Sequence, residues 1–200
     1  MISLFKDDKF KLYFTQFMII FIVFIAVGIV CGYLMPHNVV QSTVSYVMTE
    51  SVSGQMVHLS DTAFYKMLIF FVNNTLCACM LAIILPLLSR NHLTDVNNIR
   101  RTVLLSRIIV AFQAILIGVI IGYAIPIINN LSLIFMSLAP HGIVEIPAYL
   151  MAATIGVWML NEQLIDYKQL LTQFVVKIIP LIFIAAIIEA YITPYLLTII

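Results

Sequence analysis

Two acidic residues, Glu145 and Glu189, lie inside long apolar stretches of the sequence, where an ionised side chain is unfavourable. His141 precedes Glu145 by four residues, so on a helix both side chains share one face and the imidazole can reach the carboxylate. Asn73 and Asn74 form a polar pair within another apolar stretch, and asparagine amides bridge helices inside membranes. We expect these five residues to converge on one buried polar cluster.

Two kinds of chemistry fit such a cluster. Carboxylate, imidazole and amide groups can hold a proton or a divalent cation. They can also form a hydrogen-bonded knot in which at least one carboxyl group stays protonated and the group fixes helix packing. The knot is the favoured interpretation, because polar contacts are widely used to hold membrane helices together. The sequence therefore assigns no catalytic residue, no metal and no cofactor.

The composition excludes an ordinary soluble protein. Of 200 residues, 63% are hydrophobic and 10% are charged, whereas soluble domains are roughly 45–50% apolar and about 25% charged. The formal net charge is +1, without a basic tail or patch that would bind nucleic acid. The expected partners are therefore the lipid bilayer and other membrane or envelope proteins.

Five apolar stretches can position the polar residues. Each has the roughly 20 residues needed to cross about 30 Å of hydrocarbon, and each must be helical because lipid offers the backbone no hydrogen-bond partners. The predicted fold class is all-α, a polytopic bundle of about five transmembrane helices that forms a single integral membrane domain over residues 1–200. The predicted spans are residues 13–35, 62–88, 108–128, 131–160 and 171–200.

The lysines and arginines predict the orientation. If the N-terminus is cytoplasmic, all of them except Lys66 lie in or beside cytoplasmic segments, as the positive-inside bias requires. An odd number of spans then leaves the C-terminus outside. The outer segment at residues 36–61 fits either a short helix on the membrane surface or an ordinary loop, and residues 90–107 are predicted to form a loop with a short basic helix.

The fourth apolar stretch contains helix-breaking residues. Pro140 suits the first turn of a helix and removes a backbone hydrogen bond from the turn before it, and Gly142 and Pro147 follow closely. We therefore predict two half-helices separated at Pro140. A broken helix at membrane depth persists only inside protein or beside a water-filled cavity, so this segment should face the interior.

Small residues at helical spacing predict close helix packing. Gly28 and Gly32 form a GxxxG pair in the first stretch, Gly118 and Gly122 form another in the third, and Gly156 follows Ala152 by four residues in the fourth. Such pairs serve either packing within the chain or a homo-oligomer. Packing within the chain is the favoured interpretation.

The string Pro-His-Gly-Ile-Val-Glu-Ile-Pro-Ala at residues 140–148 resembles a motif of the stage II sporulation protein M family. Phe-Val-Asn-Asn at residues 71–74, the glycine-rich third stretch and Ile-Glu-Ala-Tyr-Ile-Thr-Pro at residues 188–194 follow the family's order. The resemblance implies an integral membrane protein of about five spans without known catalytic activity. It also implies partners in the envelope: the sporulation member works with peptidoglycan-degrading proteins, and other relatives occur with export or self-protection systems for antimicrobial peptides.

The sequence thus favours a non-enzymatic scaffold or transport-associated subunit of an envelope complex in a prokaryotic plasma membrane. It contains no His-Glu-x-x-His, no Gly-x-Ser-x-Gly and no P-loop, and His141 with Glu145 is too small a set for catalysis. The alternative is a permease subunit of an export or self-protection system, working with a cytosolic ATPase or as a homo-oligomer. Residues 90–107 are longer than the tight turn expected in the family, and a sporulation role is left open.

Overall fold

All regular elements in the described part of the chain are helices. The computed structural model describes residues 7–36, 62–89, 96–128, 130–162 and 167–198, and no strand occurs in these ranges. Five helices are long and apolar enough to cross a membrane, so the predicted all-α membrane bundle is confirmed. They span Asp8–Leu34, Ala63–Ser89, Val96–Ile128, Leu131–Asn161 and Lys168–Leu196.

Three of the five membrane helices are uninterrupted, namely α1 (Asp8–Leu34), α6 (Val96–Ile128) and α7 (Leu131–Asn161). The second and fifth contain π-helical turns, which are rare and often occur at functional sites. The second consists of α4 (Ala63–Cys79), η2 (Met80–Ile84) and α5 (Leu85–Ser89). The fifth consists of α8 (Tyr167–Gln173), η4 (Phe174–Ile178), α9 (Ile179–Ile187), η5 (Ile188–Ile192) and α10 (Thr193–Thr198).

Side-chain caps fix where α1 and α7 begin. The Asp7 carboxylate accepts hydrogen bonds from the backbone N–H groups of Lys9 and Phe10 at 2.8 and 3.1 Å. The Asn130 side-chain oxygen accepts in the same way from Ser132 and Leu133 at 3.1 and 3.4 Å. These caps satisfy N–H groups that have no partner within the helix.

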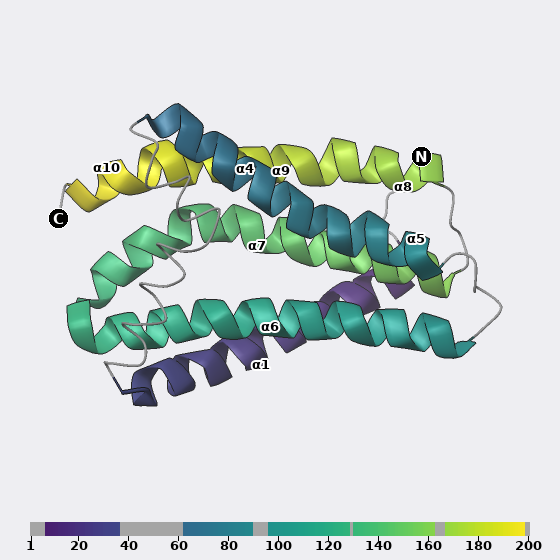
Figure 1. Ribbon diagram of the computed structural model, residues 1–200, viewed down its shortest axis with the longest axis horizontal. Coiled ribbons are helices and arrows are strands. Elements are labelled where there is room, and N and C mark those ends of the chain that lie inside the picture. Colours follow the sequence, from purple (N-terminus) through teal and green to yellow (C-terminus); the bar gives the residue numbers. More distant parts are fainter. Residues whose placement is uncertain (1–6, 37–61, 90–95, 129, 163–166, 199–200) are drawn as a thin grey trace.

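Helix α7 lies in the middle of the bundle (Figure 1). The second and fifth membrane helices lie on one side of it, and α1 and α6 lie together on the other side. From Ala148 to Leu160 almost every α7 residue is buried, whereas the other helices leave large apolar side chains on the outside. Such an outer surface suits contact with lipid, and the central helix is where a polar group can be kept away from it.

The GxxxG pairs join α1 to α6 within the chain. A Cβ atom on Gly28 would lie 2.4 Å from the Ile115 carbonyl oxygen, and one on Gly122 would lie 2.1 Å from that of Ile29. Gly32 and Gly118 are equally close to backbone atoms of the partner helix. The two backbones therefore touch, which only glycine permits at these positions.

Gly156 makes the same kind of contact elsewhere in the bundle. A Cβ atom there would lie 2.3 Å from the Leu81 carbonyl oxygen, which belongs to the π-helical turn η2. The π turn of the second helix is thus pressed against the buried half of α7. Gly142 is different, because a Cβ atom on it would meet only the Ile146 side chain, at 3.7 Å.

The structure does not show the predicted break at Pro140. Helix α7 is assigned continuously from Leu131–Asn161, with Pro140 and Pro147 inside it. Prolines are tolerated within membrane helices because neighbouring groups and local adjustments satisfy the backbone groups they leave free. The half-helix prediction is therefore corrected to one continuous helix.

The predicted connections also change. Helix α6 begins at Val96, so the second half of the predicted loop at residues 90–107 is a helical extension of the third span. It carries the exposed Arg100 and Arg101. The predicted surface helix with Val40, Val44, Val47 and Met48 lies outside the described residues.

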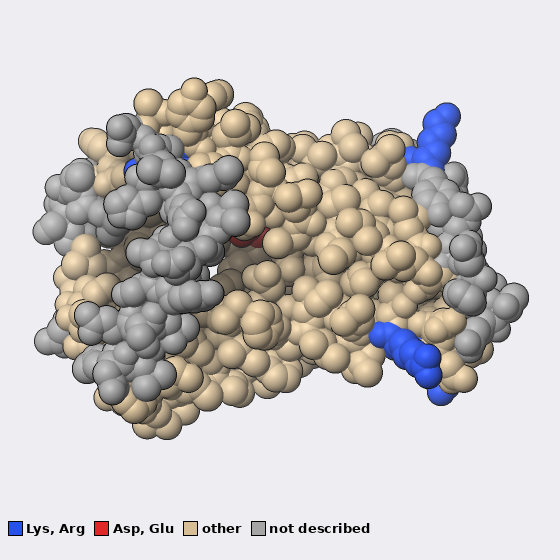
Figure 2. Space-filling model, in the orientation of Figure 1, with Lys and Arg blue, Asp and Glu red and all other residues tan. Residues whose placement is uncertain are grey.

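Charged side chains gather at the ends of the bundle. Lys9 and Glu162 form an ion pair at 2.6 Å, which links the start of α1 to the end of α7. In the face shown in Figure 2, the Lys and Arg side chains project mainly from one end, and the long body between the ends is almost free of charge. This distribution suits a molecule whose middle lies in hydrocarbon and whose ends lie in water.

Candidate functional site

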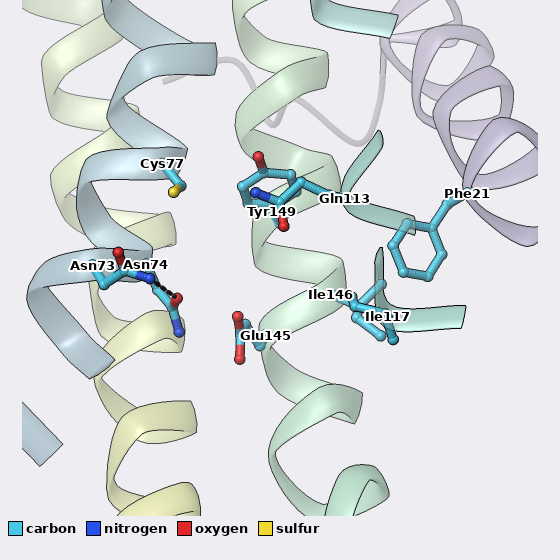
Figure 3. A pocket seen from close by; sticks show the side chains of 9 residues that line it. All are labelled: Phe21, Asn73, Asn74, Cys77, Gln113, Ile117, Glu145, Ile146 and Tyr149. Carbon is cyan, nitrogen blue, oxygen red and sulfur yellow. Dashed lines mark hydrogen bonds between the residues drawn. The ribbon is translucent and has the colours of Figure 1, made fainter. Parts of the chain in front are cut away.

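A polar pocket lies between the helices in the middle of the bundle (Figure 3). Its cavity volume is about 70 Å³, and its walls come from α1, α4, α6 and α7. In Figure 2, a few atoms of acidic residues are visible within the otherwise uncharged body of the molecule. The lining residues are Phe21, Asn73, Asn74, Cys77, Gln113, Ile117, Glu145, Ile146 and Tyr149.

The asparagine pair forms one wall of this pocket. The Asn73 side-chain nitrogen donates to the Asn74 side-chain oxygen at 3.5 Å, and Asn74 faces Glu145 across the pocket (Figure 3). Asn73 is exposed, whereas Asn74 and Glu145 are half-buried. Amide and carboxyl groups therefore meet across the space between α4 and α7.

The second group of polar residues joins α7 to the last helix. His141 and Glu145 lie one turn apart on α7, and Glu189 lies in the π turn η5. One ligand atom from each of these three half-buried side chains lies within 4.8 Å of the others. The sequence placed His141 and Glu145 on one face, and the fold brings Glu189 to that face from a different helix.

Hydrogen bonds do not explain this second group. Among the described residues, none forms a hydrogen bond or an ion pair with the side chains of His141, Glu145 or Glu189. The His141 Nδ1 atom is buried and has no hydrogen-bond partner. Buried polar atoms are normally satisfied, so this one calls for an explanation.

The five predicted residues thus form two groups that share Glu145. Asn73 and Asn74 meet Glu145 in the pocket, whereas His141 and Glu189 lie beside it without lining the pocket. Pro140 directly precedes His141, and Pro147 follows Glu145 by two residues, both within the continuous helix. What the cluster does stays a prediction.

Three polar lining residues, Cys77, Gln113 and Tyr149, were not predicted from the sequence. Gln113 projects from α6 and lies beside the Tyr149 hydroxyl, and Cys77 extends from the α4 wall. Tyr149 follows Glu145 by four residues, and Cys77 follows Asn73 by four, so helical spacing placed both on the faces already selected. Gln113 could have been found only as a polar residue inside an apolar span.

The five long helices and the polar residues turned between them define a polytopic α-helical membrane protein. A family model described as stage II sporulation protein M matches residues 17–194. The chain therefore belongs to the stage II sporulation protein M family, and the resemblance drawn from its motifs is confirmed. No curated protein and no solved structure matches the chain.

Proposed function

We propose that this chain is a non-enzymatic, transport-associated subunit of an envelope complex in a prokaryotic plasma membrane. One observation carries the proposal: a pocket lined by a carboxylate and by amide side chains lies about halfway along the apolar helices. Ionisable groups at this depth usually mark a path for an ion, a proton or a substrate. A scaffold that only held partners together would need packing surfaces and no such pocket.

The proposed orientation has a direct test. After replacing Cys31, Cys77 and Cys79, a single cysteine is introduced either at Arg100 or at Tyr33, both of which are exposed near opposite ends of the bundle. With a cytoplasmic N-terminus, a membrane-impermeant maleimide should label the Tyr33→Cys protein in intact cells and the Arg100→Cys protein only after permeabilisation. Labelling in the reverse pattern would contradict the orientation.

The proposed role is tested by comparing two acidic positions. Proteins crosslinked to the chain in native membranes are identified, and the resulting complex is reconstituted in liposomes. The Glu145→Gln variant should retain the same partners but lose at least about tenfold in transport, because the amide keeps the shape and removes the charge. The Glu162→Gln variant changes an acid at the end of the bundle, away from the pocket, and should transport normally.

Two outcomes would contradict this role. Equal transport by Glu145→Gln and the wild type would show that the pocket is not used. Loss of the partners from Glu145→Gln, with the fold intact, would instead show that the carboxylate serves assembly alone and would favour the pure scaffold.

A permease subunit of an export or antimicrobial-peptide self-protection system is the second candidate. It is favoured by the pocket walls, because four helices contribute to them and the second membrane helix, which supplies Asn73, Asn74 and Cys77, is distorted by the π turn η2. In transporters, interrupted helices line the substrate path. In that case a cytosolic ATPase should co-purify, and its ATP hydrolysis should rise when an antimicrobial peptide is added to the liposomes. The proposed subunit would show transport without such coupling.

A further inference from the structure

We propose that His141, Glu145 and Glu189 bind one divalent transition-metal ion, with Zn²⁺ as the best-fitting cation. The proposal does not depend on the transport role. It begins from placement: two of the ligands lie one turn apart on α7, and the third comes from the π turn η5 of another helix. A site built from two helices in this way is a common form of metal site in bundles.

The distances fit one ion after a small adjustment. Zinc lies about 2.0–2.2 Å from nitrogen and carboxylate oxygen, so two atoms on the same ion are at most about 4.4 Å apart. The ligand atoms here lie within 4.8 Å of one another. Binding would therefore need the ligand atoms to come closer by at most about 0.4 Å.

The lack of other partners supports the same conclusion. The buried His141 Nδ1 has no hydrogen-bond partner, and the two carboxyl groups form no ion pair with any lysine or arginine that the structure describes. Two carboxylates this close repel each other when both are ionised. A divalent cation offsets that repulsion and takes one nitrogen of the imidazole as its third ligand.

The ligand types favour zinc over the alkaline-earth ions. Imidazole suits zinc, copper, iron and nickel, whereas magnesium and calcium prefer sites made of oxygen alone. Zinc accepts histidine and glutamate together and often leaves a fourth position open. The ion would lie beside the pocket, because Glu145 belongs both to the ligand group and to the pocket wall opposite Asn74.

The test uses the full chain in lipid nanodiscs, without a polyhistidine tag. His37, His58 and His92 are replaced by alanine in every protein compared, so that His141 is the one remaining histidine. After dialysis against a chelator, the protein is titrated with Zn²⁺, and bound metal is counted by mass spectrometry. We expect one Zn²⁺ per chain and a rise in Tm on binding, because the ion stabilises only the folded state.

Three variants separate the ligands from a residue outside the group. His141→Gln and Glu189→Gln should each weaken zinc binding by at least about tenfold, the lower end of what loss of a supporting group costs a metal site. Glu162→Gln removes a carboxylate at the end of α7, where it pairs with Lys9 and not with the ligand group, and it should bind zinc as the parent does. Binding by His141→Gln and Glu189→Gln that equals the parent would overturn the proposal.

A measurement on the parent protein guards against variants that do not fold. Co²⁺ added in place of Zn²⁺ should give visible absorption bands at one equivalent, and one added equivalent of Zn²⁺ should abolish them. This measurement is made without substituting any of the three ligand residues. Absence of these bands, or the absence of stoichiometric zinc, would reject the metal site.

Discussion

Replacing Gly122 with alanine should destabilise the protein strongly, although the change adds a single methyl group. The new Cβ atom would lie 2.1 Å from the Ile29 carbonyl oxygen, which belongs to the backbone of α1 and cannot rotate away. The two helices must therefore move apart. Overpacking of this kind costs about 1–3 kcal/mol, occasionally more, and the double variant with Gly32→Ala should cost more than either single change. The measurement is the unfolding free energy in mixed micelles.

Gly142→Ala is the matched control for this change. Its Cβ atom would meet only the end of the Ile146 side chain at 3.7 Å, which is an ordinary contact. Alanine also favours a helix over glycine by roughly 0.5–1 kcal/mol, so this variant should be as stable as the wild type or more so. A similar loss of stability in both variants would show that the α1–α6 contact is not the cause.

Trp158→Ala is the second substitution that we expect to lower the stability of the protein strongly. Trp158 is 3% exposed, and its ring meets that of Phe10 edge-on, with the centroids 6.2 Å apart. In soluble cores the loss of such a side chain costs about 3–5 kcal/mol. We expect a loss of unfolding free energy at the lower end of that range. Lipid solvates apolar side chains about as well as the protein interior does, so the variant loses packing contacts but little hydrophobic stabilisation. Thermal unfolding in nanodiscs measures the effect.

Phe135→Ala provides the comparison for Trp158→Ala. Phe135 lies on the same helix but is 67% exposed. Its side chain therefore contacts mainly lipid, and its removal costs little packing within the protein. Its Tm should stay close to that of the wild type. If Phe135→Ala lowers Tm as much as Trp158→Ala does, then burial within the bundle does not determine which aromatic residues stabilise the fold.

The fold was largely predictable from the sequence, because a long apolar segment in lipid can satisfy its own backbone hydrogen bonds only as a helix. Long apolar stretches had to be helices, and their number follows from their length. Helix ends were less predictable: the apolar stretch of the third span begins at Ile108, yet α6 begins at Val96, because a helix can continue beyond the membrane into water. The π turns at Met80–Ile84, Phe174–Ile178 and Ile188–Ile192 leave no mark on apolar periodicity and were missed.

The candidate site was predictable to the extent that its residues share a helix. His141 and Glu145 are four residues apart, and this spacing alone fixes their proximity. Their approach to Glu189 depends on how two distant helices pack, which the sequence suggested only through the unfavourable burial of each acid. The break at Pro140 was wrong because a proline was taken as the end of a helix, whereas membrane helices often continue through one.

The backbone contact between α1 and α6 has a mechanical consequence. Four glycines interlock these helices, so we expect the two helices to move together as one body. The pocket lies at the seam between this pair of helices and the other helices. Phe21 of α1 and Gln113 of α6 line one side of it, and Asn74 of α4 and Glu145 of α7 line the other. Any displacement of one body against the other changes the width of the pocket, and a ligand held across the seam would resist that displacement.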